Sequence, residues 1–157
     1  MFALGTWAQT PQHQHPPIDV IDGEKNPELI PDTTAFRLWL VTVSLVPNAT
    51  AQDREFQEAH LATLRLTPLD HLALLPILTD FKIQYLNLIA RFNDAAQKGV
   101  QNTKLFQAQT DDLVQSTRAT IARQLSAVGA ANIEGYVQGE KRKIKLHVGH
   151  TTKEAAL

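Results

Sequence analysis

The segment that most constrains the fold runs from Thr67 to Gly99. Its start is marked by Thr67 followed by Pro68, because threonine caps helices and proline is favoured at the first helical position. Apolar side chains then recur at steps of three and four residues: Leu74, Leu78, Phe81, Tyr85, Leu88 and Phe92. This spacing places them on one face of a long helix, which therefore needs other helices to cover it.

The apolar face of this helix is wider than a single stripe. Leu75, Leu86 and Ile89 extend it, so we expect more than one neighbouring element to bury it. Pro76 lies inside the pattern. Because proline lacks an N–H group and clashes with the preceding turn, we predict a kink between Leu72 and Pro76.

The segment at residues 35–46 is ambiguous. Its alternation of apolar Val41, Val43 and Leu45 with polar residues is typical of a strand. Its length, and Asp32 or Thr33 as a capping residue, favour a helix. A lone strand would also have nothing to pair with among helical neighbours. We therefore predict a helix that is ended by the sequence Pro47-Asn48.

Three more helices complete the prediction. Thr50 and Asp53 resemble a capping box, which starts a helix that ends near Leu66. Its inward residues are predicted to be Phe56, His60 and Leu64. A fourth helix spans residues 103–125, with Phe106, Leu113, Thr117, Ile121 and Leu125 facing inward. Ser126 caps a fifth helix that runs to about residue 143, with Ile133 and Val137 facing inward.

These segments predict an all-α fold: a bundle of four to five helices with a kinked long third helix and an extended, Pro-rich N-terminal arm. A length of 157 residues suits one domain with a real core. We expect a signal-peptide remnant and the arm at residues 1–32, the helical domain at 33–146 and a tail at 147–157.

Composition excludes several classes of function. Cysteine is absent, so disulfides, thiolate metal sites and thiol nucleophiles are not possible. The formal net charge of −1 predicts no nucleic-acid binding. There is no continuous run of about 18 apolar residues, so no transmembrane segment is predicted.

The first residues indicate export. The stretch from Met1 to Gln9 is apolar, has small residues near its end and gives way to polar, Pro-rich sequence. This pattern is typical of the end of a signal peptide. It predicts a periplasmic or secreted protein, or a cytoplasmic one if the segment is not a signal remnant.

The two ends of the chain have opposite charge. Residues 1–35 hold five acids and one base, whereas residues 136–157 hold five bases and two acids. The ends either meet, within one chain or between chains, or remain as two solvated tails. Residues 18–31 of the arm contain more apolar side chains than a simple linker does. We therefore expect this segment to dock on the helices or on a neighbouring chain. The partner-binding candidates are Ile18, Val20, Ile21, Leu29, Ile30, Lys141, Arg142, Lys143 and Lys145.

The sequence offers no candidate reaction centre. Glu-x-x-His pairs, a Gly-x-Ser-x-Gly elbow and glycine-rich phosphate loops are all missing. We predict no catalytic residue and no cofactor. Weak metal-ligand candidates are the pairs His13/His15 and His147/His150, because neighbouring histidines in a tail can hold a metal weakly.

Two helix starts share a short motif. Leu66-Thr67-Pro68-Leu69-Asp70 and Leu125-Ser126-Ala127-Val128-Gly129 each place Leu-Ser/Thr before a helix. The pair is similar to the two Leu-Thr-x-x-Gln motifs of small exported helical proteins, which include periplasmic chaperones and metal-stress sensors. Asp70 and Gly129 stand where that motif has glutamine. The resemblance implies a helical, often dimeric protein that holds partners on a concave surface.

We therefore expect a non-enzymatic interaction, scaffold or chaperone-like protein of the cell envelope, which binds a protein partner or associates with itself. This hypothesis predicts an exposed apolar patch or a self-complementary face. The alternative is a metal or small-ligand sensor that uses histidines. An enzyme of an unrecognised class is a third possibility.

Overall fold

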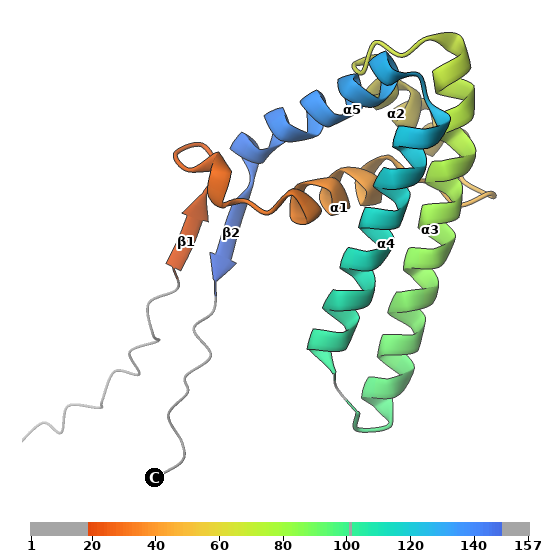
Figure 1. Ribbon diagram of the computed structural model, residues 1–157. Coiled ribbons are helices and arrows are strands. Elements are labelled where there is room, and N and C mark those ends of the chain that lie inside the picture. Colours follow the sequence, from red (N-terminus) through yellow and green to blue (C-terminus); the bar gives the residue numbers. More distant parts are fainter. Residues whose placement is uncertain (1–18, 101, 149–157) are drawn as a thin grey trace, which may run out of the picture.

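The computed structural model describes residues 19–100 and 102–148, and these residues confirm the all-α class (Figure 1). Within them lie five helices: α1 (Asp32–Val43), α2 (Ala51–Ala62), α3 (Pro68–Gln97), α4 (Thr103–Gln124) and α5 (Ala127–Glu140). Two 3-10 turns, Pro27–Leu29 and Lys141–Lys143, and two strands, β1 (Asp19–Asp22) and β2 (Lys145–Val148), complete the described chain.

The predicted caps of α2, α3 and α5 are confirmed. The Thr50 hydroxyl accepts a hydrogen bond from the Asp53 amide at 3.1 Å, and the Asp53 carboxylate accepts one from the Thr50 amide at 3.0 Å. The hydroxyls of Thr67 and Ser126 accept hydrogen bonds from the amides of Asp70 and Gly129, and so cap α3 and α5. The ambiguous segment forms α1, as predicted, but its N-cap is Pro31 and makes no side-chain bond, so the expected cap at Asp32 or Thr33 is wrong.

Helix α3 continues through Pro76. Because proline has no N–H group, the carbonyl of Leu72 loses its intrahelical partner there, and Leu72 lies where water reaches it. The kink at this site stays a prediction. The helix ends in a Schellman motif: Val100 N donates to Ala95 O, and Gly99 adopts a φ of 77° that a side chain would strain.

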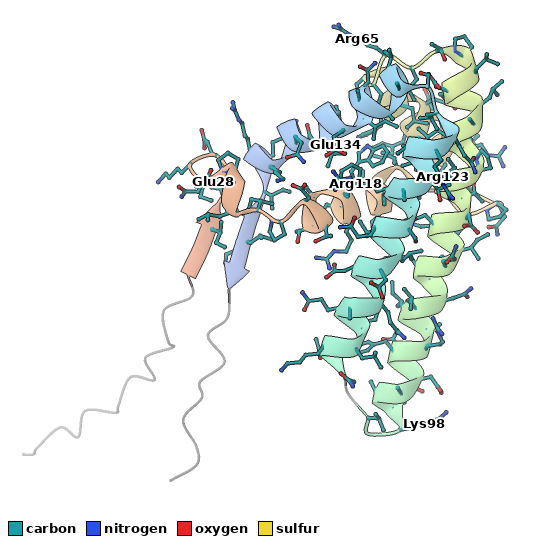
Figure 2. All side chains as sticks on the ribbon, viewed as in Figure 1. Glu28, Arg65, Lys98, Arg118, Arg123 and Glu134 are labelled. Carbon is teal, nitrogen blue, oxygen red and sulfur yellow. The ribbon has the colours of Figure 1, made fainter. Side chains whose placement is uncertain are left out.

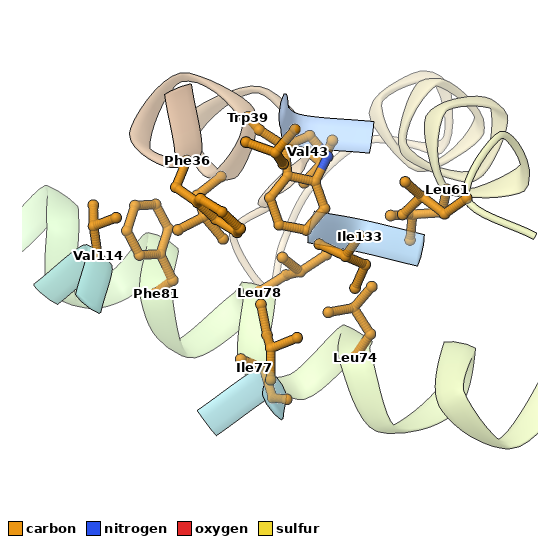
Figure 3. Close-up of a cluster of buried hydrophobic side chains, with 14 of the residues drawn as sticks. Phe36, Trp39, Val43, Leu61, Leu74, Ile77, Leu78, Phe81, Val114 and Ile133 are labelled. Atoms are coloured by element: carbon orange, nitrogen blue, oxygen red, sulfur yellow. The ribbon is translucent and has the colours of Figure 1, made fainter. Parts of the chain in front are cut away.

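Helices α3 and α4 form a long antiparallel pair, and α1, α2 and α5 pack against only one end of it (Figure 1). The other end, at the turn near Lys98, projects beyond the remaining helices (Figures 1 and 2). The core lies where α1 crosses the pair, and α5 packs beside α1 (Figure 3). Its largest fully buried side chains include Phe36, Leu40, Leu74, Leu78, Phe81, Val114 and Ile133.

The inner face of α2 differs from the prediction. Gln57, Leu61 and Leu64 are buried, whereas Phe56 is 50% exposed and its ring lies tilted against that of His60, with centroids 4.1 Å apart. The buried Gln57 amide donates a 2.7 Å hydrogen bond to Val43 O, a carbonyl in the last turn of α1 that lacks a helical partner. This polar contact draws the Gln57 face inward.

A small sheet joins the segment before the helices to the segment after them. Strands β1 and β2 pair antiparallel, with Asp19 opposite Val148 and Asp22 opposite Lys145. Gly23 follows β1, and a Cβ there would lie 2.0 Å from the Lys141 carbonyl oxygen, so only glycine fits. The oppositely charged ends thus meet within one chain.

Candidate interaction surface

The described partner-binding candidates of the arm have unequal exposure. Ile30 is buried against the helices, Ile21 is half-buried, and Val20 and Leu29 are about half exposed. Ile18 lies outside the described residues. Part of the apolar content of this arm is therefore used inside the chain, by pairing with β2 and by burial of Ile30.

Among the basic candidates, Lys141 is buried and forms an ion pair with Asp32 at the start of α1. It therefore holds α1 to the end of α5. Arg142, Lys143 and Lys145 are exposed. A 2.7 Å hydrogen bond to Glu140 raises the pKa of Lys143. The basic group is thus divided between one buried structural residue and three surface residues.

Arg118 of α4 links three helices. Its guanidinium makes two hydrogen bonds to Glu134 of α5, at 2.6 and 3.1 Å, and lies 3.7 Å from Asp32 (Figure 2). It also covers the ring of Phe36 at 4.7 Å. The Lys141 and Gln138 side chains, with Arg118 more weakly, hold the pKa of Asp32 below its ordinary value. These charges fix α1, α4 and α5 against one another.

The histidine candidates are not brought together in the described residues. His147 is exposed on β2, opposite Val20. His13, His15 and His150 lie outside the described residues. His71 Nε2 lies 3.0 Å from Glu58 Oε2, without hydrogen-bond alignment. No group of three or more His, Asp or Glu side chains within residues 19–100 and 102–148 is placed to hold a metal ion.

Asp70 joins the starts of two helices. One carboxylate oxygen accepts a 2.7 Å hydrogen bond from the Ser126 amide. The other accepts from the hydroxyls of Ser126, at 2.7 Å, and Thr67, at 2.9 Å. Each hydroxyl in turn caps its own helix, so one carboxylate completes the caps of both α3 and α5.

The sequence did not reveal this junction, although it contained a signal for it. Asp70 and Gly129 occupy equivalent positions in the two short motifs, and the structure brings these positions into contact. A Cβ on Gly129 would lie 2.6 Å from the Asp70 Oδ2 atom. The aspartate and the glycine are therefore matched to each other, because a larger residue at position 129 would overlap the carboxylate.

The Asp70 junction predicts acid sensitivity. The Ser126 amide and hydroxyl, with Thr67, lower the pKa of Asp70, so the ionised form stabilises the fold above the unfolded pKa of about 4. That stabilisation is lost as pH falls through the folded pKa. Urea unfolding measures the free energy of unfolding of the wild type and of Asp70→Asn. The difference between these two free energies should become smaller as the pH is lowered from about 6 to about 3. A difference that stays constant over this range would contradict the prediction.

The side of α3 that faces away from the core is largely apolar and partly exposed to solvent. We call it the outer face of α3, and it consists of Leu69, Leu72, Pro76, Thr79, Ile83, Leu86 and Ala90. Leu69 is 80% exposed, Leu72 64%, and Ile83 and Leu86 just over 40%. The expectation that Leu86 would be buried is wrong, because α1 and α4 cover the opposite side of the helix.

Helix α3 is long and apolar enough to cross a membrane by length and composition alone, although core helices of soluble proteins also meet that criterion. Only 28% of its most apolar window is buried in the fold, so burial within this chain does not account for its composition. Scattered apolar residues are ordinary on protein surfaces, whereas a contiguous row marks a contact site.

A groove lies beside this face, between α3 and α4, and has a volume of about 840 Å³. Six of its nine lining residues are polar: Gln84, Asn87, Arg91, Gln109, Asp112 and Ser116. The groove is open to solvent along the projecting half of the pair. It offers hydrogen-bonding groups at the edge of the outer face, as a polar rim does around an interface.

Comparison with known proteins finds no matching family model, no similar curated protein and no similar solved structure.

Proposed function

We propose that this chain is a non-enzymatic helical interaction protein that binds a protein partner through the outer face of α3. The observation that carries the proposal is the row of four large, exposed apolar side chains: Leu69, Leu72, Ile83 and Leu86. Burying such a row would remove apolar surface from water, which is the main driving force for protein association. The polar groove beside it would supply the rim of the interface.

The outer face of α3 belongs to a helix that its neighbours already hold in place, which favours a role in binding. The core half of α3 is held by α1 and α4, and its first turn is joined to α5 through Asp70. A helix that is already ordered loses little conformational freedom on binding. A scaffold or chaperone-like role in the cell envelope is consistent with this surface, and the envelope location rests on the sequence pattern at Met1–Gln9.

Site-specific photo-crosslinking in the native cells tests the proposed function. A photo-reactive amino acid replacing Ile83 or Leu86 should give a discrete adduct with another polypeptide chain. The matched control is Val128, which is 68% exposed and apolar but lies on another helix, α5. Absence of adducts from both α3 positions, or equal adducts from Val128, would refute the proposed function.

A further inference from the structure

We propose that the partner bound by the outer face of α3 is a second copy of this chain, with the two α3 helices packed antiparallel. This inference rests on the proposed function and names its partner. The residues of the outer face are separated by steps of three, four, three, four, three and four, from Leu69 to Ala90. That spacing is the seam of a helix that packs along another helix.

The seam is complementary to itself. A two-fold axis between Pro76 and Thr79 places Leu72 opposite Ile83 of the second copy. The same axis places Leu69 opposite Leu86, and Pro76 opposite Thr79. Each large exposed side chain therefore meets another large one, and the two smaller residues lie at the centre. An isologous interface requires this kind of match, because one surface serves both partners.

The flanking charges permit this register. Asp80 and Lys82 lie on opposite sides of the seam, and both are turned away from it. Gln84 donates a 2.7 Å hydrogen bond to Asp80, and Lys82 reaches Val41 O on α1 at 3.4 Å. Across the seam, the nearest flanking residues of the second copy are Ala73 and Leu75. Neither Asp80 nor Lys82 is therefore brought against a like charge at the centre of the seam.

A lipid surface suits the outer face less well. From Leu69 to Ala90, α3 has two acidic residues, Asp70 and Asp80, and one basic residue, Lys82. A helix that lies on an anionic membrane carries a row of Lys and Arg beside its apolar face. A single pair of helices is also a small interface, so we expect a dimer whose population rises with protein concentration.

Disulfide crosslinking tests the register directly, because the 157-residue chain has no cysteine of its own. The double variant Leu72→Cys/Ile83→Cys should form a covalent dimer under mild oxidation. Leu72→Cys alone should not, because the axis places the two copies of that residue about 16 Å apart along the helix. The variant Leu72→Cys/Ala90→Cys is the control for register, because these two residues would face each other only if the helices were shifted by seven residues. Crosslinking that is equal in all three variants would overturn the proposal.

Light scattering over a wide range of concentrations provides the second readout. The wild-type mass should rise toward twice the monomer mass, and Ile83→Lys should remain monomeric with an unchanged circular dichroism spectrum. Val128→Lys should behave as the wild type does. A wild type that stays monomeric throughout would overturn the dimer. If the photo-reactive residue at position 86 then gave an adduct with a different polypeptide, the proposed function would stand and only the dimer would be wrong. If it gave no adduct, the proposed function and the dimer would both be wrong.

Discussion

The substitution Gly129→Ala is expected to lower the free energy of unfolding by about 2 to 3 kcal/mol, as overpacking in a tight site does. The added Cβ would lie 2.6 Å from the Oδ2 atom and 2.8 Å from the Cγ atom of Asp70. That carboxylate cannot withdraw without losing its hydrogen bonds to Ser126. For a chain of this size, the melting temperature should fall by about 5 to 10 °C.

A double-mutant cycle shows whether the contact with Asp70 is the cause. In an Asp70→Ala background the nearest remaining atom, the Asp70 Cβ position, lies 3.3 Å away, so Gly129→Ala should cost much less there. The matched control is Gly135→Ala in the same helix, where a Cβ meets nothing within 4 Å. This control should stabilise the protein slightly, since alanine favours helix. Additive effects of the Asp70 and Gly129 changes would disprove the clash.

The substitution Phe36→Ala should have the largest effect, a loss of about 3 to 5 kcal/mol in the free energy of unfolding. Phe36 is 1% exposed and packs edge-on against Trp39 at the crossing of α1 with the α3–α4 pair (Figure 3). The guanidinium of Arg118 also lies over its ring, with the Cζ atom 4.7 Å from the ring centroid. The truncation therefore opens a cavity and removes the surface on which Arg118 rests. Chemical denaturation at neutral pH measures the loss.

Comparison with Phe36→Leu separates the two effects. Leucine fills most of the cavity but offers no aromatic face. In a double-mutant cycle of Phe36→Leu with Arg118→Met, the coupling energy therefore reports the cation–π contact. We expect that coupling to be about 0.5 to 2 kcal/mol. If Phe36→Ala lowered stability no more than a typical surface substitution does, Phe36 would not be a core residue.

The helices could be predicted because their signals are local. Thr50, Thr67 and Ser126 each carry a capping hydroxyl next to a periodic apolar segment, and Gly99 ends α3 where the pattern stops. The strands could not be predicted. Each is only four residues long, too short for a clear alternation, and its partner lies at the other end of the chain.

The sequence predicted an exposed apolar patch but did not place it on α3. The apolar width of α3 was visible in the sequence, but periodicity does not say which part of a wide face other helices will cover. Leu86 and Ile83 are exposed because α1 and α4 approach α3 from its other side. Asp70 could not be recognised as a shared cap, since its second partner, Ser126, is distant in sequence and becomes a neighbour only through packing.

Pairing of β1 with β2 also makes this fold a module with a single point of attachment. Because Asp19 lies opposite Val148, the described chain enters and leaves the helical domain one strand spacing apart, or about 5 Å. Closely spaced entry and exit points allow a domain to be inserted into a surface loop of another protein without forcing that loop open. Residues 19–148 are therefore suited to being grafted as one unit, with the outer face of α3 carried on the opposite part of the molecule (Figure 1).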